Sequence, residues 1–421
     1  MPLVGHWRQV VTVVLLLQAG SLFPASAATF RCASADPLTC GLATWERSGP
    51  DAARPSTGHS NNSVLVLTLV QDEHSWGTGR SFINYFKLLS ASMTAAGSLS
   101  LALLVGGKGE FSKLACAVEG IYRRALSKQE TNSCGLFECS QASKGSTGFA
   151  SGACPASIDS LPQSLQSLLR VTLMQPGSLG GHQMDANLSR EERHSFPHQR
   201  ERRSLLARLR NKLLMTALQD EAAVLWVDAD VHGIDDSMLG RMLASGLDII
   251  TPNCKWRHWS HGKARYYDYN TWRGPLQTPN DNDRDLMRQG AMFQPKIWWD
   301  RLDNVSAGPS FLPAYEHLDF VEVTAVGATV LFVRADVHRQ GVIFTPGYVV
   351  GADWEREGWD GVESEGICIL ARMMGFKCHG MPQTIVWHES PPDRPTQTTD
   401  KQQGSALQIA RIPLDFLREH G

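Results

Sequence analysis

From residue 64 onward, continuous apolar runs alternate with amphipathic stretches. Residues 64–70 and 99–105 are largely apolar runs, which are typical of strands covered on both faces, as in a parallel sheet. Residues 80–93 and 111–126 follow these runs and place apolar side chains at helical spacing. The order strand, helix, strand, helix predicts an open α/β sheet.

The same alternation continues after an interruption. Residues 128–160 are rich in serine and glycine, and we expect a surface insertion there. Residues 169–173 then predict a strand, and residues 199–218 predict a helix with a leucine stripe and many arginines. The remaining predictions are strands at 224–230, 248–251, 321–323, 330–333, 377–380 and 385–387, and helices at 237–245, 363–374 and 407–420.

The most informative strand is the one predicted at 224–230, because it ends in Asp228 and Asp230. Alternate residues of a strand share a face, so we expect both carboxylates on one side. Carboxylates at the carboxyl end of a strand suit a hard cation such as Mn²⁺ or Mg²⁺ that holds a phosphorylated ligand. The alternative is that the two aspartates only cap the turn or helix that follows.

Other residues are candidates for the same ligand. His388 follows a later strand and is either a third metal ligand or a surface histidine. The arginines of helix 199–218 either neutralise a diphosphate or form a solvated basic face. Glu363 and Glu365 either open a helix or place a carboxylate near the anomeric carbon of a sugar. Residues 267–272 mix aromatic and polar side chains, which suits a sugar or a loop that packs its own rings.

Composition and the amino terminus indicate the compartment. The chain has 421 residues and a net charge of −2, so no basic excess points to nucleic acid. Residues 10–28 are uncharged, with an apolar centre and a final Ala-Ser-Ala that predicts a signal peptide. Nine cysteines and several N-glycosylation sequons fit the lumen of the secretory pathway, where we expect some disulfides.

We therefore expect three parts in the chain. Residues 1–28 are a cleaved signal peptide or a retained signal anchor, and residues 29–60, rich in Ala, Ser, Pro and Gly, are a stem or linker. Residues 61–421 form a single catalytic domain that carries the insertion at 128–160. A retained anchor would attach the protein to a membrane as a type II protein, whereas cleavage would lead to secretion.

The order of these segments resembles glycosyltransferase family 62, the fungal Golgi mannan-polymerase mannosyltransferases. The resemblance extends from about residue 61 to residue 389. Its most specific parts are Glu192-Arg193-His194-Ser195-Phe196 and Leu225-Trp226-Val227-Asp228-Ala229-Asp230. The other segments that carry it are 199, 202–203, 207–208, 210–211, 252–253, 267–268, 270–272, 332–337, 363–366, 375–376 and 387–388.

The resemblance implies a GT-A fold with a mixed, mostly parallel sheet, a Golgi location and Mn²⁺ (or Mg²⁺) as cofactor. It also implies GDP-mannose as donor, a glycan or glycoprotein as acceptor, retention of configuration, and partner subunits in a transferase complex. By position, Asp230 and His388 look like metal ligands, with Asp228 assisting the metal or the ribose. The other implied contacts are Thr68 and Asp72 for the nucleotide, Arg208 and Asn211 for the donor, Asp268, Asn270 and Trp272 for the sugar or acceptor, and Glu363 and Glu365 for catalysis.

The chain also departs from the family pattern. It has glycines and a lysine at 106–110 and Thr324 where an acidic residue is usual, and residues 351–360 are unlike the common sequence. Two alternatives therefore stay open. One is a non-catalytic glycan- or nucleotide-binding subunit of a transferase complex, and the other is a GT-A transferase that uses another nucleotide sugar, such as a UDP-sugar.

Overall fold

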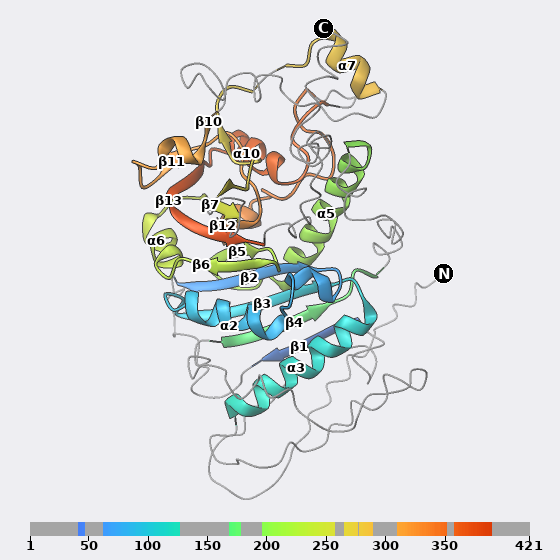
Figure 1. The fold of residues 1–421 in the computed structure, drawn as a ribbon, viewed down its shortest axis with the longest axis vertical. Coiled ribbons are helices and arrows are strands. Elements are labelled where there is room, and N and C mark those ends of the chain that lie inside the picture. The colour runs from blue at the N-terminus through green and yellow to red at the C-terminus, as the bar shows by residue number, and fades with distance from the viewer. Residues whose placement is uncertain are drawn as a thin grey trace, which may run out of the picture.

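The computed structural model describes residues 41–46, 62–126, 168–177, 196–256, 265–276, 278–288, 310–351 and 358–389. These residues form one large mixed sheet covered by helices, which extends across the molecule from β1 at one edge to β13 and β11 at the other (Figure 1). The predicted signal segment, the insertion at 128–160 and the helix predicted at 407–420 lie outside the described residues.

The main sheet has the strand order β1-β4-β3-β2-β5-β12-β7-β13-β11, with β6 beside β13 and β8 beside β7. Its strands are β1 (Leu42–Glu46), β2 (Ser63–Val70), β3 (Ser98–Val105), β4 (Leu168–Met174), β5 (Ala223–Val227), β6 (Val231–Ile234), β7 (Ile249–Trp256), β8 (Arg265–Tyr266), β11 (Val321–Glu322), β12 (Val330–Arg334) and β13 (Cys378–His388). A second, two-stranded sheet pairs β9 (Trp272–Arg273) with β10 (Ser310–Phe311).

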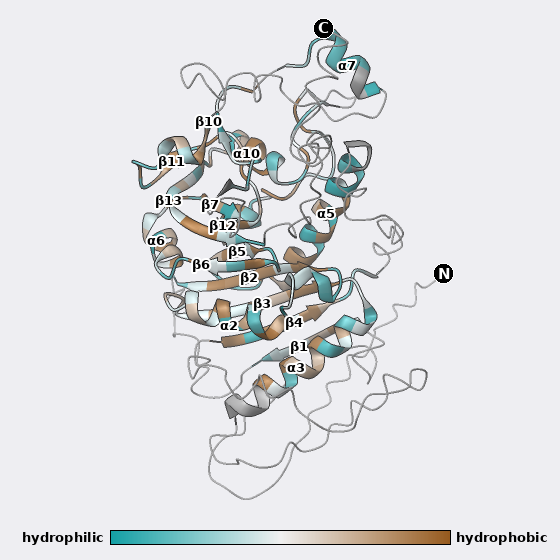
Figure 2. Cartoon of the chain, viewed as in Figure 1, coloured by the Kyte–Doolittle hydropathy of each residue, from teal (hydrophilic) through white to brown (hydrophobic). Residues whose placement is uncertain are grey.

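The helices connect and cover these strands. The α-helices are α2 (Phe82–Ser92), α3 (Lys108–Leu126), α5 (Phe196–Ala217), α6 (Met238–Ser245), α7 (Asp281–Arg288), α9 (Ala335–Arg339) and α10 (Ser364–Met373). Two short 3₁₀ helices are η2 (Glu73–Trp76) and η8 (Leu312–Tyr315). Helix α7 is hydrophilic and lies apart from the sheet (Figures 1 and 2).

Parallel pairing dominates the first half of the sheet. Strands β4, β3, β2 and β5 are mutually parallel, and β7 pairs with β13 in parallel in the second half. Between the halves, β12 runs antiparallel to both β5 and β7. This arrangement confirms the predicted α/β class with a mixed, mostly parallel central sheet, as expected of a GT-A fold.

The core consists of two apolar layers on opposite faces of the sheet. Alternate residues of β2 point into different layers, with Val64 and Val66 in one and Leu65 and Leu67 in the other. Helices α2, α3 and α6 cover the first layer, and α5, α9 and α10 cover the second. The central strands are apolar along most of their length (Figure 2), which explains why their sequences are continuous apolar runs.

Some predicted boundaries were wrong. Residues 42–46, inside the predicted linker, form β1, which pairs antiparallel with β4 at the edge of the sheet. The two short strands predicted at 377–380 and 385–387 are parts of one strand, β13. A register shift between Met381 and Ile385 lets this strand accommodate Pro382, which has no N–H to donate to β7.

A disulfide joins Cys368 of α10 to Cys378, the first residue of β13. It fixes α10 relative to the strand that ends at His388. Cys254 is buried and reduced. None of the described helices is both long and apolar enough to cross a bilayer.

Candidate metal centre and active site

The two aspartates lie in the tight turn between β5 and β6. Strand β5 ends at Val227, and Val231 N–H donates to the Asp228 carbonyl (3.2 Å), which closes the turn. The expectation that an extended strand carries both carboxylates on one face was therefore wrong. The turn achieves the same result, because it brings both side chains to the carboxyl end of β5.

His388 meets the aspartates from the far end of the chain. It is the last residue of β13, and it lies opposite Val231 in the pairing of β13 with β6. One ligand atom from each of Asp228, Asp230 and His388 lies within 4.8 Å of the other two. Two carboxylates and one imidazole are a donor set that suits Mn²⁺, so the side chains present fit the metal that the sequence predicts.

The imidazole of His388 is held in a defined orientation. Its Nδ1 is 2.8 Å from the Glu389 carbonyl oxygen, so Nδ1 carries the proton and Nε2 faces Asp230 Oδ1 at 3.1 Å. The ring also stacks on Tyr267, with centroids 3.9 Å apart and an interplanar angle of 18°. Glu389 N–H donates to the Asp230 carbonyl (3.1 Å), which ties the two ligand segments together.

The electrostatics of the centre reflect partial burial. Burial raises the pKa of Asp228 to about 6, although the neighbouring Arg210 lowers it. Burial alone would lower the pKa of His388, but Asp230 and the Glu389 carbonyl outweigh it and the pKa is raised. The neighbouring Asp230 also raises the pKa of Asp228, and a bound cation would relieve this repulsion between the carboxylates.

Two arginines of α5 lie beside this centre on one face of the helix. Arg203 and Arg210 are seven residues, or about two helical turns, apart. Arg210 donates to Asp228 Oδ1 (3.3 Å) and forms an ion pair with Glu363. Arg203 forms an ion pair with Glu365 (3.0 Å) and donates to Asn270 Oδ1 (2.7 Å).

Both predicted catalytic glutamates face α5, although they are only two residues apart. Glu363 precedes α10 and has a φ of +63°, which is costly for any residue except glycine. Its N–H donates to the Thr345 carbonyl (2.7 Å), which holds the backbone in this conformation. Because Glu363 is outside the helix, its side chain reaches Arg210 while Glu365, in the first turn, reaches Arg203.

Asp268 is buried at the base of the loop that carries Asn270. Its carboxylate accepts hydrogen bonds from Asn270 N–H (3.2 Å) and the Thr271 hydroxyl (3.2 Å). Burial raises the pKa of Asp268 to about 6, and the two hydrogen bonds lower it. A side chain at Gly327 would overlap this carboxylate, so the loop needs glycine there.

The other predicted nucleotide and donor residues have contacts within the fold. The Thr68 hydroxyl is 2.6 Å from the Tyr85 hydroxyl, and Asp72 caps η2 by accepting from His74 N–H. Both amide atoms of Asn211 bond to the backbone of Phe344 (2.6 and 3.0 Å). Arg208 is exposed on the opposite face of α5 from the arginines of the centre.

Trp272 is buried, and its backbone pairs with Ala325. The predicted residues that the structure gathers around the centre are Asp228, Asp230, His388, Glu363, Glu365, Asp268 and Asn270. Sequence reasoning proposed the arginines of this helix only as a group, without singling out Arg203 and Arg210, and it did not foresee that Tyr267 stacks on His388. The seven-residue spacing of the two arginines was a usable signal, whereas nothing in the sequence indicates the stacking of Tyr267.

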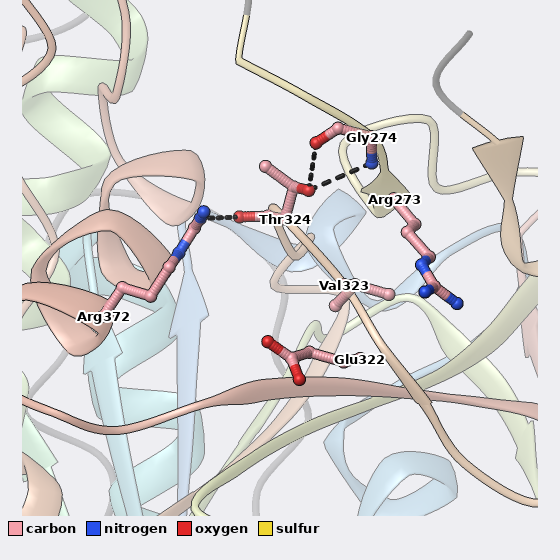
Figure 3. Close-up of a pocket in the computed structure, with 6 residues that line it drawn as sticks. All are labelled: Arg273, Gly274, Glu322, Val323, Thr324 and Arg372. Atoms are coloured by element: carbon pink, nitrogen blue, oxygen red, sulfur yellow. Dashed lines mark hydrogen bonds between the residues drawn. The ribbon is translucent and has the colours of Figure 1, made fainter. Parts of the chain in front are cut away.

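A cavity of about 310 Å³ lies at the other end of α10, lined by Arg273, Gly274, Glu322, Val323, Thr324 and Arg372 (Figure 3). Two residues of its wall are joined, because the Thr324 hydroxyl donates to the Gly274 carbonyl (2.5 Å) and accepts from Gly274 N–H (3.0 Å). Arg372 points toward Thr324 and donates to its carbonyl (2.8 Å), whereas Arg273 points away from it (Figure 3). None of the metal-centre residues lines this cavity.

Comparisons with known proteins point to one family. The model of the Anp1 family matches residues 51–348. The "Mannan polymerase complex subunit mnn9" of Schizosaccharomyces pombe is 29% identical over 232 residues, which are 52% of this chain and 60% of that protein. The "Mannan polymerase II complex ANP1 subunit" of Saccharomyces cerevisiae is 29% identical over 204 residues, 47% of this chain and 38% of that one.

The matches thus span about half the length of these curated relatives. Among solved structures, "GalNAc-T7 with UDP, GalNAc and Mn2+" is similar with a TM-score of 0.36 and 8% identity. That match covers 85% of this chain and 50% of the other.

Proposed function

Because the chain belongs to the Anp1 family, we propose that it is a metal-dependent glycosyltransferase that moves mannose from GDP-mannose to a glycan acceptor with retention of configuration. The observation that carries this proposal is the convergence of Asp228, Asp230 and His388 at the carboxyl end of β5, with Arg210 beside them. Two strands distant in sequence have to meet to form this group, which a simple capping role for the aspartates does not require.

In this proposal Asp228, Asp230 and His388 hold Mn²⁺ or Mg²⁺ against the diphosphate of the donor. Bound there, the cation would offset the negative charge that develops on the leaving diphosphate. Arg210 adds fixed positive charge at the same place, because its guanidinium is buried against Asp228. The site therefore favours a donor whose leaving group is a nucleoside diphosphate.

In this proposal Glu363, Glu365 and residues 268–270 contact the sugar of the donor. Glu363 is fixed by its backbone and by Arg210, so its carboxylate keeps one position as positive charge develops at the anomeric carbon. Asn270 presents an amide that is oriented by Arg203 and by its own N–H bond to Asp268. Such an oriented amide suits the hydroxyl groups of a sugar.

The relatives support a further part of the proposal. Both are named as subunits of mannan polymerase complexes, so we propose that this protein also works with partner subunits on a mannan-type or glycoprotein acceptor. We place it in the Golgi lumen, with residues 1–28 acting as a signal peptide or a signal anchor.

A thermal-shift panel on the full chain tests the proposal. Wild-type protein is heated with GDP-mannose, GDP or UDP-sugars, with and without Mn²⁺, and GDP release from GDP-mannose is measured with α-mannobiose as acceptor. We expect stabilisation by GDP-mannose that depends on Mn²⁺ and is lost in Asp230→Asn. The matched control is Asp236→Asn, which removes the same charge from an exposed position.

Each outcome of the panel has a definite meaning. Stabilisation by UDP-sugars rather than GDP-mannose would make the protein a transferase for another donor. Mn²⁺-dependent binding of GDP-mannose without turnover, even with partner subunits present, would make it a non-catalytic subunit. If Asp230→Asn and Asp236→Asn behave like the wild type with Mn²⁺, the metal centre is assigned to the wrong residues.

A further inference from the structure

A second carboxyl pair, Asp360 and Glu365, lies at the Arg203 end of α5, whereas Arg210 lies at the candidate metal centre. Asp360 is hydrogen-bonded through its side chain to Glu365, the residue that also pairs with Arg203 (3.0 Å). Two carboxyl groups in direct contact cannot both be ionised cheaply, so such a pair shares a proton. Asp360 lies beyond residue 348, where the match to the family model ends.

Asp360 is held firmly in this position. Its carbonyl accepts hydrogen bonds from Val349 N–H (2.8 Å) and Val350 N–H (3.1 Å), and its Oδ1 accepts from Gly361 N–H (2.7 Å). Burial and the adjacent Glu365 raise the pKa of Asp360 to about 7, while Gly361 N–H and Arg203 lower it. The carboxyl pair is therefore preorganised and does not depend on an incoming group for its geometry.

Tyr348 supplies an independent sign of a ligand. Its hydroxyl is buried and has no hydrogen-bond partner among the described residues. Its ring lies under the guanidinium of Arg200 (5.0 Å), and its hydroxyl interacts electrostatically with Asp360, Glu365 and Arg203. A buried hydroxyl without a partner costs free energy that a bound polar ligand would recover.

The position of this group relative to the metal centre indicates which substrate it serves. Arg210 contacts Asp228 of the candidate metal centre, and Arg203 contacts Glu365 of the carboxyl pair. The two arginines are roughly 10 Å apart along α5. Asn270 lies between these two groups, because it accepts a hydrogen bond from Arg203 and its N–H donates to Asp268. A ligand at Asp360 is thus next to the sugar region and remote from the diphosphate.

We propose that Asp360, Glu365 and Tyr348 form the acceptor subsite and bind the hydroxyl groups of a neutral sugar. This inference rests on the proposed function, since it names the acceptor side of the same site. The pair keeps its one proton in the Asp360–Glu365 hydrogen bond and accepts from a sugar hydroxyl through its remaining oxygen lone pairs, while the unpartnered Tyr348 hydroxyl can donate. Arg203 already donates to Glu365 and Asn270, and Asp360 and Glu365 are acidic, so the subsite disfavours a phosphorylated or carboxylated sugar.

The proposal fixes the sign of a pH dependence. Below about pH 7 the pair keeps the proton that holds Asp360 to Glu365, and above it the two carboxylates repel each other, the subsite loses its geometry and the acceptor KM rises. The groups that face Asp360 are Glu365 from α10, Arg203 and Arg200 from α5, and Tyr348 from the segment whose Val350 pairs with Asp360. In Asp360→Asn the amide still donates to Glu365, so the acceptor KM stays low and no longer changes near pH 7.

The test measures transfer from GDP-mannose to α-mannobiose by the full chain from pH 5.5 to 8.5, an interval of about 1.5 pH units on either side of the pKa. Asp360→Ala should raise the acceptor KM ~10-fold, and Tyr348→Phe ~3-fold, as expected for lost hydrogen bonds. The donor KM and the Mn²⁺-dependent thermal shift should not change. The controls Asp236→Asn and Tyr315→Phe lie outside the site and should match the wild type.

Failure of the subsite is distinguishable from failure of the proposed function. If the wild type transfers mannose but Asp360→Ala keeps its acceptor KM and pH profile, the subsite is refuted alone. If Asp360→Ala instead changes the donor KM, the pair serves the donor and the inference is again refuted. A wild type that shows no Mn²⁺-dependent transfer refutes the proposed function, and the acceptor subsite with it.

Discussion

Replacing Arg210 by methionine removes one guanidinium and leaves a side chain of similar length in the same apolar surroundings. The guanidinium is within 3.3 Å of Asp228, forms an ion pair with Glu363 and lies over the Phe344 ring at 5.1 Å. Methionine keeps the ring contact but leaves both carboxylates without their countercharge.

The magnitude follows from how exposed each carboxylate is. Removing one partner of a buried ion pair costs about 3–5 kcal/mol when the other stays buried. The Glu363 side chain is 7% exposed, whereas Asp228 is 35% exposed and can regain water. We therefore expect a loss of about 3 kcal/mol, most of it from Glu363, and a Tm that is lower by about 6–12 °C.

Differential scanning fluorimetry of Arg210→Met and Arg208→Met at pH 7.5 and pH 5 measures this loss. Arg208 is two residues away on the same helix but exposed, so its replacement should change the stability by less than about 0.5 kcal/mol. At pH 5 the difference between the two variants should shrink by the part that comes from Asp228, because burial raises the pKa of Asp228 to about 6 and the protonated carboxyl needs no countercharge. Equal Tm values for both variants at pH 7.5 would refute the assignment of Arg210 as the buried countercharge.

The remaining predictions concern the sugar loop and the metal ligands. Gly327→Ala should cost about 1–3 kcal/mol in urea unfolding, since the new methyl group overlaps the Asp268 carboxylate. Gly109→Ala in α3 has open space and should be neutral or stabilising, so equal urea midpoints for the two variants would contradict the crowding at Gly327. Tyr267→Ala should weaken Mn²⁺ binding, followed by thermal shift, about 10-fold because His388 loses its stacking partner. Tyr267→Phe keeps the stacked ring and should bind Mn²⁺ like the wild type. If Tyr267→Ala and Tyr267→Phe lose Mn²⁺ affinity equally, the stacking on His388 is not what supports Mn²⁺ binding.

The sequence predicts the parallel half of the fold well, because the apolar runs of β2 and β3 are local signals. It predicts the far half less well. Strand β13 contains Gly380 and Pro382, which interrupt the pattern, and its continuity depends on pairing with β7 and β6. Strand β1 is likewise held by β4, a partner more than a hundred residues away, and its own composition resembles that of a linker.

The site shows the same division between local and long-range information. Asp228, Asp230 and His388 are recognisable in the sequence because each lies at or just beyond the end of an apolar run. The choice among the arginines of α5 is not, because it depends on how the helix is rotated against the sheet. Arg203 and Arg210 are about 20° apart around the helix axis, whereas Arg208 is about 160° from Arg210.

The contacts between α5 and the start of α10 are better explained by a ligand than by stability. Buried ion pairs such as Arg210–Glu363 contribute little net free energy to folding, and the positive φ of Glu363 costs about 1–3 kcal/mol. The unpartnered Tyr348 hydroxyl adds a further cost. A fold selected only for stability would replace these features with apolar packing, so their concentration along one face of α5 supports the proposal that this face binds substrate.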